Sequence, residues 1–329
     1  MTLTKRLIEA AALCAVGAAV LARHDATLAA EGRGAAPAAV TRPAALPPVA
    51  EHKYRMLAKV RPLLFWISKD DVGGARITWR GDDNGGFGLD VLIGSDPQRA
   101  PRQINRWGYI AEDVQGAEAH VIGVMKQSTE QSIAEAESQL AKEQGRSGYV
   151  YRAIQGTTTS QEARADVKTV RVERDLTFRD IDPLLALVNG PAGATRDGES
   201  RSVPLPAGTR PGFLMALLDL VRQSTNAYSQ PGGSFKPSST PTPYVYYGVF
   251  YELTMKSSTL LRTATIDGQR YTNLARSDFE IRNRSNGETT RFQLTYGTAG
   301  ELAGIPVHAI YQPRWWFEVQ LFLDEHAAF

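Results

Sequence analysis

The sequence predicts an α+β fold made mainly of antiparallel strands, arranged as an open barrel or as sandwich-like sheets, with about three helices, one of them largely buried. Three observations lead to this prediction. Apolar and polar residues alternate through most of residues 244–329, which is the period of a strand with one buried face. A turn dipeptide, Asp267-Gly268, interrupts this alternation. The run Gly212–Val221 is apolar around most of a helix and predicts that this helix is buried.

The composition is that of a globular protein that is long enough for one large core or for two domains. The chain has 329 residues, of which 43% are hydrophobic and 22% are charged. Its formal net charge is +2, from 37 basic and 35 acidic residues. Because this balance lacks the basic excess that a polyphosphate partner requires, a nucleic-acid partner is not expected.

Residues 1–30 have the layout of a secretory signal peptide. Lys5 and Arg6 precede an apolar run that ends in small residues near Ala22 and Ala30. This layout predicts export to the periplasm or the extracellular space. Glu9 inside the apolar run leaves a retained anchor as the alternative. The Pro/Ala-rich residues 31–52 that follow predict an extended tether.

The single cysteine, Cys14, lies inside the predicted signal peptide. The exported chain would therefore contain no disulfide, no thiol nucleophile and no cysteine metal site. No later run of about 18 apolar residues occurs, so the mature chain is expected to lack a membrane span.

Residues 53–228 are predicted to form an α+β domain. The expected strands are the apolar runs at 61–67, 74–80, 89–94, 119–125 and 148–154. The expected helices cover 128–145, Asp182–Val188 and about Pro211–Asn226.

A Pro/Gly/Ser-rich segment, residues 229–243, predicts a flexible linker or loop. Residues 244–329 after it would form an antiparallel β domain, or a sheet packed on the first domain. A second turn dipeptide, Asn286-Gly287, supports the strand assignment there. Whether the two parts form one domain or two is left open by the sequence.

The sequence shows no local catalytic or metal-binding motif. The five histidines, at positions 24, 52, 120, 308 and 326, lack zinc-ligand spacing, and neither G-x-S-x-G, a Walker A loop nor G-x-G-x-x-G occurs. Neither a metal nor a cofactor is expected. GGFG at 85–88 could belong to a calcium loop with Asp82, Asn84 and Asp90, but a hairpin turn explains the same residues. KDDVGG at 69–74 has the composition of a turn.

Two stretches provide candidate ligand-binding residues. Strand alternation after residue 314 would place Trp315 in the core and Trp316 on the opposite face, with Glu318 and Phe322. Aromatic and polar side chains on one face suit an apolar or amphipathic ligand, although a second packing surface is the simpler explanation of the same residues. Arg106 and Trp107, in a cationic stretch at 96–109, could hold an anionic group or lie in a solvated loop.

Three functional hypotheses follow. The first is an exported bacterial envelope protein without enzymatic activity, which binds or carries an apolar or amphipathic small molecule. The second is a secreted hydrolase whose site is assembled in space from carboxylates and a histidine, drawn from Asp70, Asp71, Glu112, Asp113, His120 and His308. The third is a structural or interaction module, whose protein partner the sequence does not identify.

Overall fold

The computed structural model of the chain describes residues 46–61, 66–126, 142, 148–190 and 195–327. Its strands form one 14-stranded sheet in which every neighbouring pair is antiparallel. In spatial order the strands are β8 (Thr195–Pro204), β7 (Glu162–Val172), β6 (Tyr149–Thr158), β5 (Glu118–Met125), β4 (Trp107–Gln115), β3 (Phe87–Ser95), β2 (Ile67–Gly81), β1 (Pro48–Val60), β14 (Phe317–Leu323), β13 (Pro306–Arg314), β12 (Thr289–Gly297), β11 (Gln269–Asn283), β10 (Val249–Ile266) and β9 (Thr242–Tyr246).

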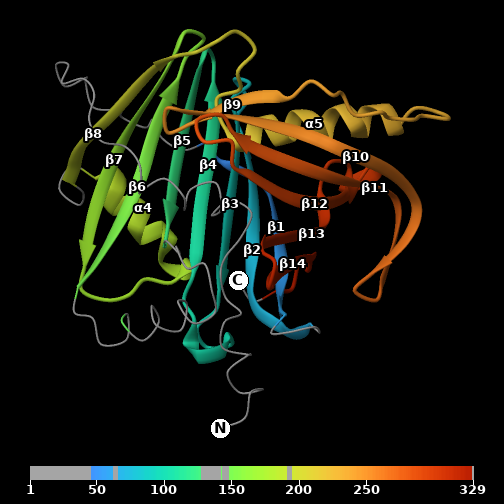
Figure 1. Ribbon diagram of the computed structural model, residues 1–329, viewed down its shortest axis with the longest axis horizontal. Helices are drawn as coiled ribbons and strands as arrows, with labels where there is room; N and C mark the ends of the chain where they lie inside the picture. Colours follow the sequence, from blue (N-terminus) through green and yellow to red (C-terminus); the bar gives the residue numbers. More distant parts are fainter. Residues whose placement is uncertain (1–45, 62–65, 127–141, 143–147, 191–194, 328–329) are drawn as a thin grey trace.

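The pairing of β1 with β14 joins the N-terminal strands to the C-terminal strands in this one sheet. The sheet is strongly twisted, since β3 to β7 run nearly upright in Figure 1 while β10 to β12 cross the other half almost horizontally. Residues 229–241 form the loop between α5 (Phe213–Tyr228) and β9. The predicted division into two domains stays a prediction. The strands before and after this loop nevertheless lie in one sheet, because β1 is hydrogen-bonded to β14.

The predicted antiparallel strand character is confirmed, and the helix count is lower than expected. The runs at 74–80, 89–94 and 119–125 lie within β2, β3 and β5. The two α-helices of the described residues are α4 (Ile181–Asn189) and α5, close to the expected positions. The third expected helix, at 128–145, falls almost wholly outside the described residues. Short 3-10 helices are η2 (Pro101–Gln103), η3 (Phe178–Asp180) and η4 (Gly300–Leu302).

The start of the described chain differs from the predicted tether. Residues 1–45, which include the predicted signal peptide, lie outside the described residues, but β1 begins at Pro48, inside the predicted tether 31–52. Its first residue pairs with Arg80 of β2. Proline is tolerated here because the first residue of a strand can lack a ladder donor. In the part of the chain that the structure describes, no helix is long and apolar enough to cross a bilayer.

The prediction of a turn at 69–74 was wrong, because these residues form an irregular part of β2. Met56 of β1 pairs with Gly73 whereas Ala58 pairs with Lys69, so β2 contains extra residues at this point. Asp71 adopts a left-handed conformation with φ of 53°. The same Gly and Asp residues that favour turns also suit a β-bulge, and for this reason the composition was misleading.

The hairpin predictions were correct. Asp267 and Gly268, with φ of 51° and 78°, form the two-residue turn between β10 and β11. Asn286 and Gly287 lie in the β11–β12 turn. The β2–β3 turn is closed by the carboxylate of Asp82, which accepts hydrogen bonds from the backbone N–H groups of Asn84 (2.9 Å) and Gly86 (2.8 Å).

The two faces of the sheet are covered differently. α5 packs between the two halves of the sheet, in a core that combines residues of β3 to β5 with residues of β9 to β13 (among them Leu89, Ile110, Val121, Tyr251, Phe279, Phe292 and Tyr311). η3 and α4 cover the opposite face of β3 to β7, over a core that includes Trp107, Tyr109, Ile122, Tyr151, Phe178 and Leu184. The predicted burial of the 211–226 helix is therefore confirmed.

Candidate functional site

Trp315 and Trp316 form a turn and are not part of a strand. β13 ends at Arg314 and β14 begins at Phe317, and these two residues pair directly, so the tryptophans are the two central residues of a tight hairpin. Trp315 is 66% exposed, whereas Trp316 is 2% exposed. The predicted orientation, with Trp315 in the core and Trp316 on the opposite face, was therefore wrong.

Trp316 belongs to the core beneath the turn. It clusters with residues of β1, β2 and β14 that include Met56, Val60 and Val72. Its backbone carbonyl accepts a 2.7 Å hydrogen bond from the N–H of Arg61. The strand alternation beyond the turn was predicted correctly for Phe317 and Val319, both of which are buried in the same cluster.

Phe322 and Glu318 lie on the other face of β14, apart from Trp316. The Phe322 ring stacks on the His308 ring, with the centroids 4.6 Å apart, and the guanidinium of Arg55 lies 5.3 Å from its centroid. Glu318 forms an ion pair with Lys59 at 2.9 Å and accepts a hydrogen bond from Gln320. Phe322 and Trp316 belong to different core clusters, so the structure does not bring them together in one ligand wall.

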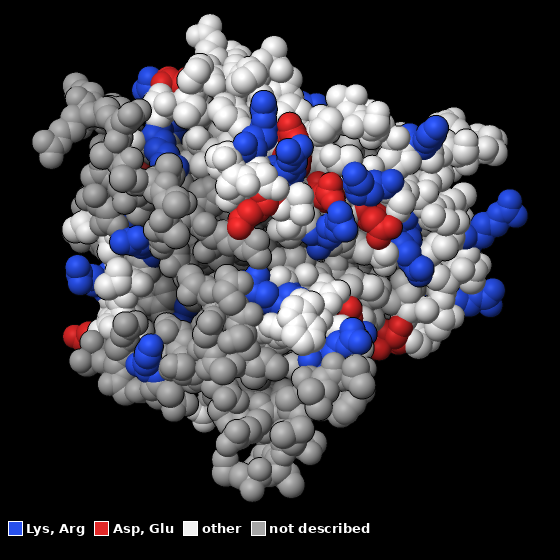
Figure 2. All heavy atoms as spheres, in the orientation of Figure 1, with Lys and Arg blue, Asp and Glu red and all other residues white. Residues whose placement is uncertain are grey.

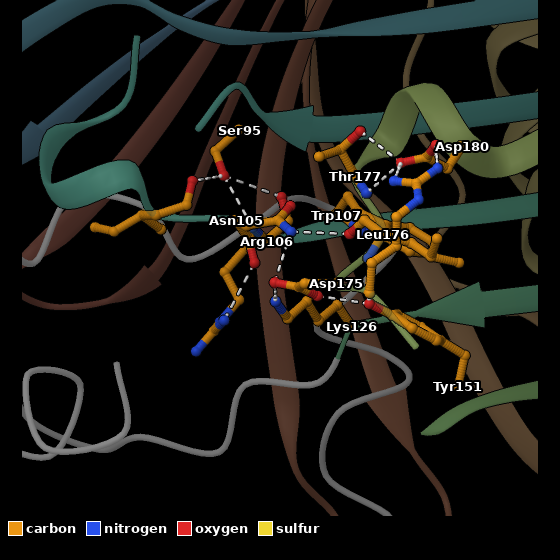
Figure 3. A network of polar contacts seen from close by, with 12 residues as sticks. Ser95, Asn105, Arg106, Trp107, Lys126, Tyr151, Asp175, Leu176, Thr177 and Asp180 are labelled. Carbon is orange, nitrogen blue, oxygen red and sulfur yellow. Dashed lines mark hydrogen bonds and ion pairs between the residues drawn. The ribbon is translucent and has the colours of Figure 1, made fainter. Parts of the chain in front are cut away.

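Arg106 and Trp107 are buried within a polar network on the α4 side of the sheet (Figure 3). The N–H of Arg106 donates to Ser95 Oγ (2.9 Å) and its guanidinium donates to the carbonyl of Asn105 (3.1 Å). Trp107 stacks on Tyr151 and donates through its indole N–H to the carbonyl of Leu176 (2.9 Å). Both side chains are thus engaged within the protein.

The centre of this network is Asp175, in the segment between β7 and η3. Its carboxylate accepts hydrogen bonds from Lys126 (2.5 Å), Tyr151 (2.6 Å) and Asn105 (3.0 Å), as Figure 3 shows. The hydroxyl of Tyr151 in turn accepts from the N–H of Leu176 (2.7 Å). These contacts hold the 175–177 backbone against β4 to β6 and position η3 and α4 over the sheet.

Most of the groups suggested for a hydrolase lie in separate places, but Asp113 of β4 and His120 of β5 are direct cross-strand neighbours. His308 lies 3.2 Å from the Gln320 side chain, and burial lowers its pKa. His120 lies 3.7 Å from Glu118. Asp70 and Asp71 form ion pairs with Arg55 and Arg99, respectively. Among the described residues no three His, Cys, Asp or Glu side chains gather around a common point. The hydrolase hypothesis stays a prediction that these contacts do not favour.

Glu112 of β4 is a buried carboxylate that holds the start of α5. Its two oxygens accept hydrogen bonds from the N–H groups of Leu214 (2.8 Å) and Met215 (2.9 Å). Burial raises the pKa of Glu112 to about 7, against the opposing effect of these N–H groups. A Cβ on Gly212 would lie 2.2 Å from the Glu112 carboxyl carbon, so this contact requires glycine.

Two tyrosines of β9 lie near this carboxylate. Burial raises the pKa of Tyr244 and of Tyr246 well above the ordinary value, and the charge of Glu112 raises both further. Neither hydroxyl has a hydrogen-bond partner among the described residues. The Tyr246 ring reaches across to β5, where a Cβ on Gly123 would lie 1.7 Å from the Tyr246 hydroxyl. β9, α5, β4 and β5 therefore meet at one buried polar centre, which no sequence motif indicated.

Exposed tryptophans gather at one end of the sheet. Trp66, just before β2, is 39% exposed and Trp315 is 66% exposed. Val60, the last residue of β1, pairs with both Ile67 and Phe317, so the two tryptophans flank neighbouring strand ends. We call Trp66 and Trp315, with the basic residues Arg61, Lys69 and Arg314, the tryptophan end. Residues 62–65, between Arg61 and Trp66, lie outside the described residues and are not part of the tryptophan end.

Several charged side chains elsewhere on the sheet form ion pairs. On β10 to β12 and the turn after β11, Glu280 contacts Lys256 and Arg291, and Arg284 contacts Glu252. Figure 2 shows acidic and basic side chains intermixed at the centre right of the molecule, while the charged side chains along its right-hand edge are basic. The intermixed part of this face therefore does not favour a strongly charged ligand.

No family model matches the chain, and no curated protein sequence matches it significantly. A solved structure that is similar is the crystal structure of a beta-barrel-like protein of the domain of unknown function DUF1849, from Brucella abortus. The similarity covers 86% of this chain and 98% of that chain, at 9% sequence identity and a TM-score of 0.35. A likeness at this level carries no inference about function.

Proposed function

We propose that the protein is a non-enzymatic binding protein of the bacterial envelope and that it binds an apolar or amphipathic ligand through the tryptophan end. The observation that carries this proposal is the exposure of Trp66 and Trp315 at neighbouring strand ends. Tryptophan combines a large apolar ring with one polar N–H, so an exposed pair suits a ligand that has both apolar and polar parts.

The exposed apolar side chains support this choice of surface. The large hydrophobic residues that are exposed in the described part of the chain are Val49, Trp66, Val150, Leu187 and Trp315. Both tryptophans of this set lie at the same end of the sheet, and gathered exposed apolar groups commonly mark a binding surface. The proposal keeps the predicted ligand class but moves the site from Trp316 to its neighbour Trp315.

The envelope setting comes from the N-terminal sequence. The Lys5 and Arg6 region and the apolar run after it favour export, which would bring the protein into contact with lipids and other amphiphiles. Mass spectrometry of the protein from its native cell tests this part of the proposal. A mature N-terminus between about residues 22 and 31 is expected, whereas an intact Met1 on protein in the cytoplasm would contradict it.

Binding is tested by titrating the protein with a monomeric lysophospholipid in a calorimeter. We expect saturable binding that weakens roughly tenfold when Trp66 or Trp315 is replaced by alanine, since one large aromatic contact is worth about that factor. Val150→Ala is the matched control, because Val150 is exposed but lies on β6. Equal binding by all three variants and the parent protein would refute the proposed site.

A further inference from the structure

We infer that the outer edge of β10 accepts an added strand, in which an extended acidic segment of a protein partner pairs with Thr259–Ile266. This surface shares no residue with the tryptophan end, so the inference goes beyond the proposed function and does not depend on it. It rests on three observations: the unpaired edge, the charge beside it, and the fixed position of the hairpin that carries it.

The first observation is that β9 covers only part of β10. β9 pairs with Val249–Leu253, although β10 continues to Ile266. Tyr228 of α5 still reaches Ser258, through a 3.1 Å hydrogen bond between the two side-chain hydroxyls. Beyond that contact, in the part of the chain that the structure describes, Thr259–Ile266 pairs with β11 alone. A strand of this length spans about 26 Å, which is enough to pair with a further strand.

The register of the β10–β11 hairpin indicates which backbone groups this edge presents. Ile266 and Gln269 flank the two-residue turn, so they form a hydrogen-bonded pair whose N–H and C=O groups point toward each other. Every second residue of β10, counted back from the one before Ile266, therefore directs its N–H and C=O groups away from β11. These outward-facing residues are Thr259, Leu261, Thr263 and Thr265. Among the described residues nothing hydrogen-bonds to these groups, and such a row is a template for an added strand.

The residue types along this edge also favour pairing. Threonine and isoleucine, which suit strands, recur in Thr259–Ile266, and the stretch contains no proline. The bulge of β10 lies before it, between Met255 and Ser257, and does not interrupt it. Its one charged residue is Arg262, so most of the means by which proteins block an exposed edge are missing here.

The second observation is the charge beside the edge. Arg262 of β10 and Arg270 and Arg276 of β11 are exposed, and none of them forms an ion pair within the described chain. Residues 259–276 contain these three basic side chains and one acidic side chain, so the local net charge is 3 − 1 = +2. In Figure 2 the charged side chains along the right-hand edge, where Figure 1 shows the β10–β11 hairpin, are basic.

This charge identifies the class of partner. Arg276 lies opposite Thr259 and Arg270 lies opposite Thr265, so the two arginines stand one strand away from the two ends of the free edge. Neighbouring strands are about 5 Å apart, and an arginine side chain is long enough to reach across a threonine to a carboxylate on an added strand. A second copy of this chain would bring the same arginines, and like charges on paired strands are destabilising.

The third observation is that the hairpin is held in place. Asp267 in its turn forms an ion pair with Arg55 of β1. Ile266 and Leu274 are buried in a core cluster with Phe322 of β14. The edge is therefore fixed before a partner arrives, which reduces the entropic cost of adding a strand.

The experiment uses a fluorescently labelled synthetic peptide of about ten residues, in which glutamate alternates with threonine and valine, and follows its anisotropy as the full chain is added. One control peptide has lysine in place of glutamate. The other keeps the glutamates but has N-methyl groups on two adjacent central residues, which removes a donor from each edge of the peptide. We expect saturable binding of the acidic peptide, and binding at least about tenfold weaker for both controls.

Two pairs of protein variants locate the site. Thr263→Pro removes an outward N–H and leaves the ladder to β11 intact, so it should weaken binding about tenfold, whereas Thr263→Val keeps that N–H and should bind like the parent. The double variant Arg270→Gln, Arg276→Gln should weaken binding severalfold and reduce its dependence on salt. Arg171→Gln, at an exposed position of β7, is its control and should change neither.

The alternatives have distinct outcomes. Equal binding of the N-methylated and parent peptides would show attraction by charge alone and would overturn strand addition, whether or not Thr263→Pro folds. Equal binding of the lysine peptide would overturn the acidic partner, and no binding of any peptide would overturn docking at this edge. If the parent formed a dimer in analytical ultracentrifugation that Thr263→Pro abolished, and no peptide bound, the edge would pair with a second copy. That result would also overturn the inference.

Discussion

Trp315 and Trp316 are neighbours in one two-residue turn, yet Trp315 is 66% exposed and Trp316 is 2% exposed. The turn reverses the chain between Arg314 and Phe317, so the two side chains leave the backbone in different directions. Trp316 fills the core between β1, β2 and β14, and Trp315 remains at the surface. The adjacent tryptophans therefore have separate roles, one in stability and one available for binding.

The first prediction concerns stability at these two positions. Trp316→Ala should lower the free energy of unfolding by about 3–5 kcal/mol, because it leaves a cavity in a packed core. Trp315→Ala should change it by less than about 0.5 kcal/mol, because the exposed ring has few packing contacts to lose. Urea unfolding followed by circular dichroism measures both values. Similar losses for the two variants would contradict the assignment of Trp316 alone to the core.

The tryptophan assignment also shows what the sequence could not provide. The alternation Phe317, Val319, Leu321 correctly predicted one buried face of β14. Extending that alternation back to Trp315 failed because the strand ends at Phe317. The turn contains neither glycine, asparagine nor aspartate, and neither tryptophan has a positive φ, so no turn signal marked it. By contrast, Asp267-Gly268 was predicted correctly because its residues suit the left-handed conformation that the turn requires.

The buried polar centre was beyond sequence reasoning for a different reason. Glu112 and Leu214 are 102 residues apart, and their contact depends on how α5 enters the space between the two halves of the sheet. The alternation of residues along β4 indicates on which face of the sheet Glu112 lies. It does not identify the helix that packs against that face. The pairing of β1 with β14 is likewise a long-range contact, and for this reason a boundary near 229–243 was predicted between strands that share one sheet.

The second prediction compares two buried tyrosines. Tyr246→Phe should change the free energy of unfolding by less than about 1 kcal/mol, because it removes a hydroxyl that has no partner among the described residues. Tyr296→Phe should cost roughly 1–3 kcal/mol, since its hydroxyl contacts Ser224 (2.5 Å) and Ser277 (2.8 Å) in the core. Thermal unfolding of the two variants side by side gives the comparison. A larger loss for Tyr246→Phe would indicate that its hydroxyl is satisfied by bound water.

The third prediction tests the network in Figure 3. Asp175→Asn should destabilise the protein by about 2 kcal/mol or more, because Lys126 then lacks its ion pair and an amide oxygen replaces a charged acceptor. Asp182→Asn, at an exposed position at the start of α4, is the control and should cost under about 1 kcal/mol. Hydrogen exchange should show increased opening of α4 in the Asp175 variant. Unchanged exchange there would contradict the role of Asp175 in positioning η3 and α4.

The last prediction concerns pH and follows from Glu112. Its pKa is raised from 4.5 to about 7 in the folded protein, so between these values the folded state holds a proton that the unfolded state has lost. Stability contributed by this proton is fully present below about pH 4.5 and declines as pH rises toward 7. The difference between the two pKa values corresponds to roughly 3 kcal/mol. The nearby Tyr244 and Tyr246 do not titrate in this window, because their pKa values are raised well above 10.

Glu112→Gln isolates this effect, because glutamine cannot titrate. We expect the stability of the parent protein relative to this variant to fall by a few kcal/mol between about pH 4.5 and 7 and then to level off, whatever the variant's absolute stability. Glu301→Gln, at an exposed position, is the matched control and should leave the pH profile of the parent unchanged. Urea unfolding at closely spaced pH values provides the curves. Parallel curves for the parent and Glu112→Gln would show that α5 docks on a carboxylate that is ionised throughout this range, with the helix N–H groups outweighing its burial.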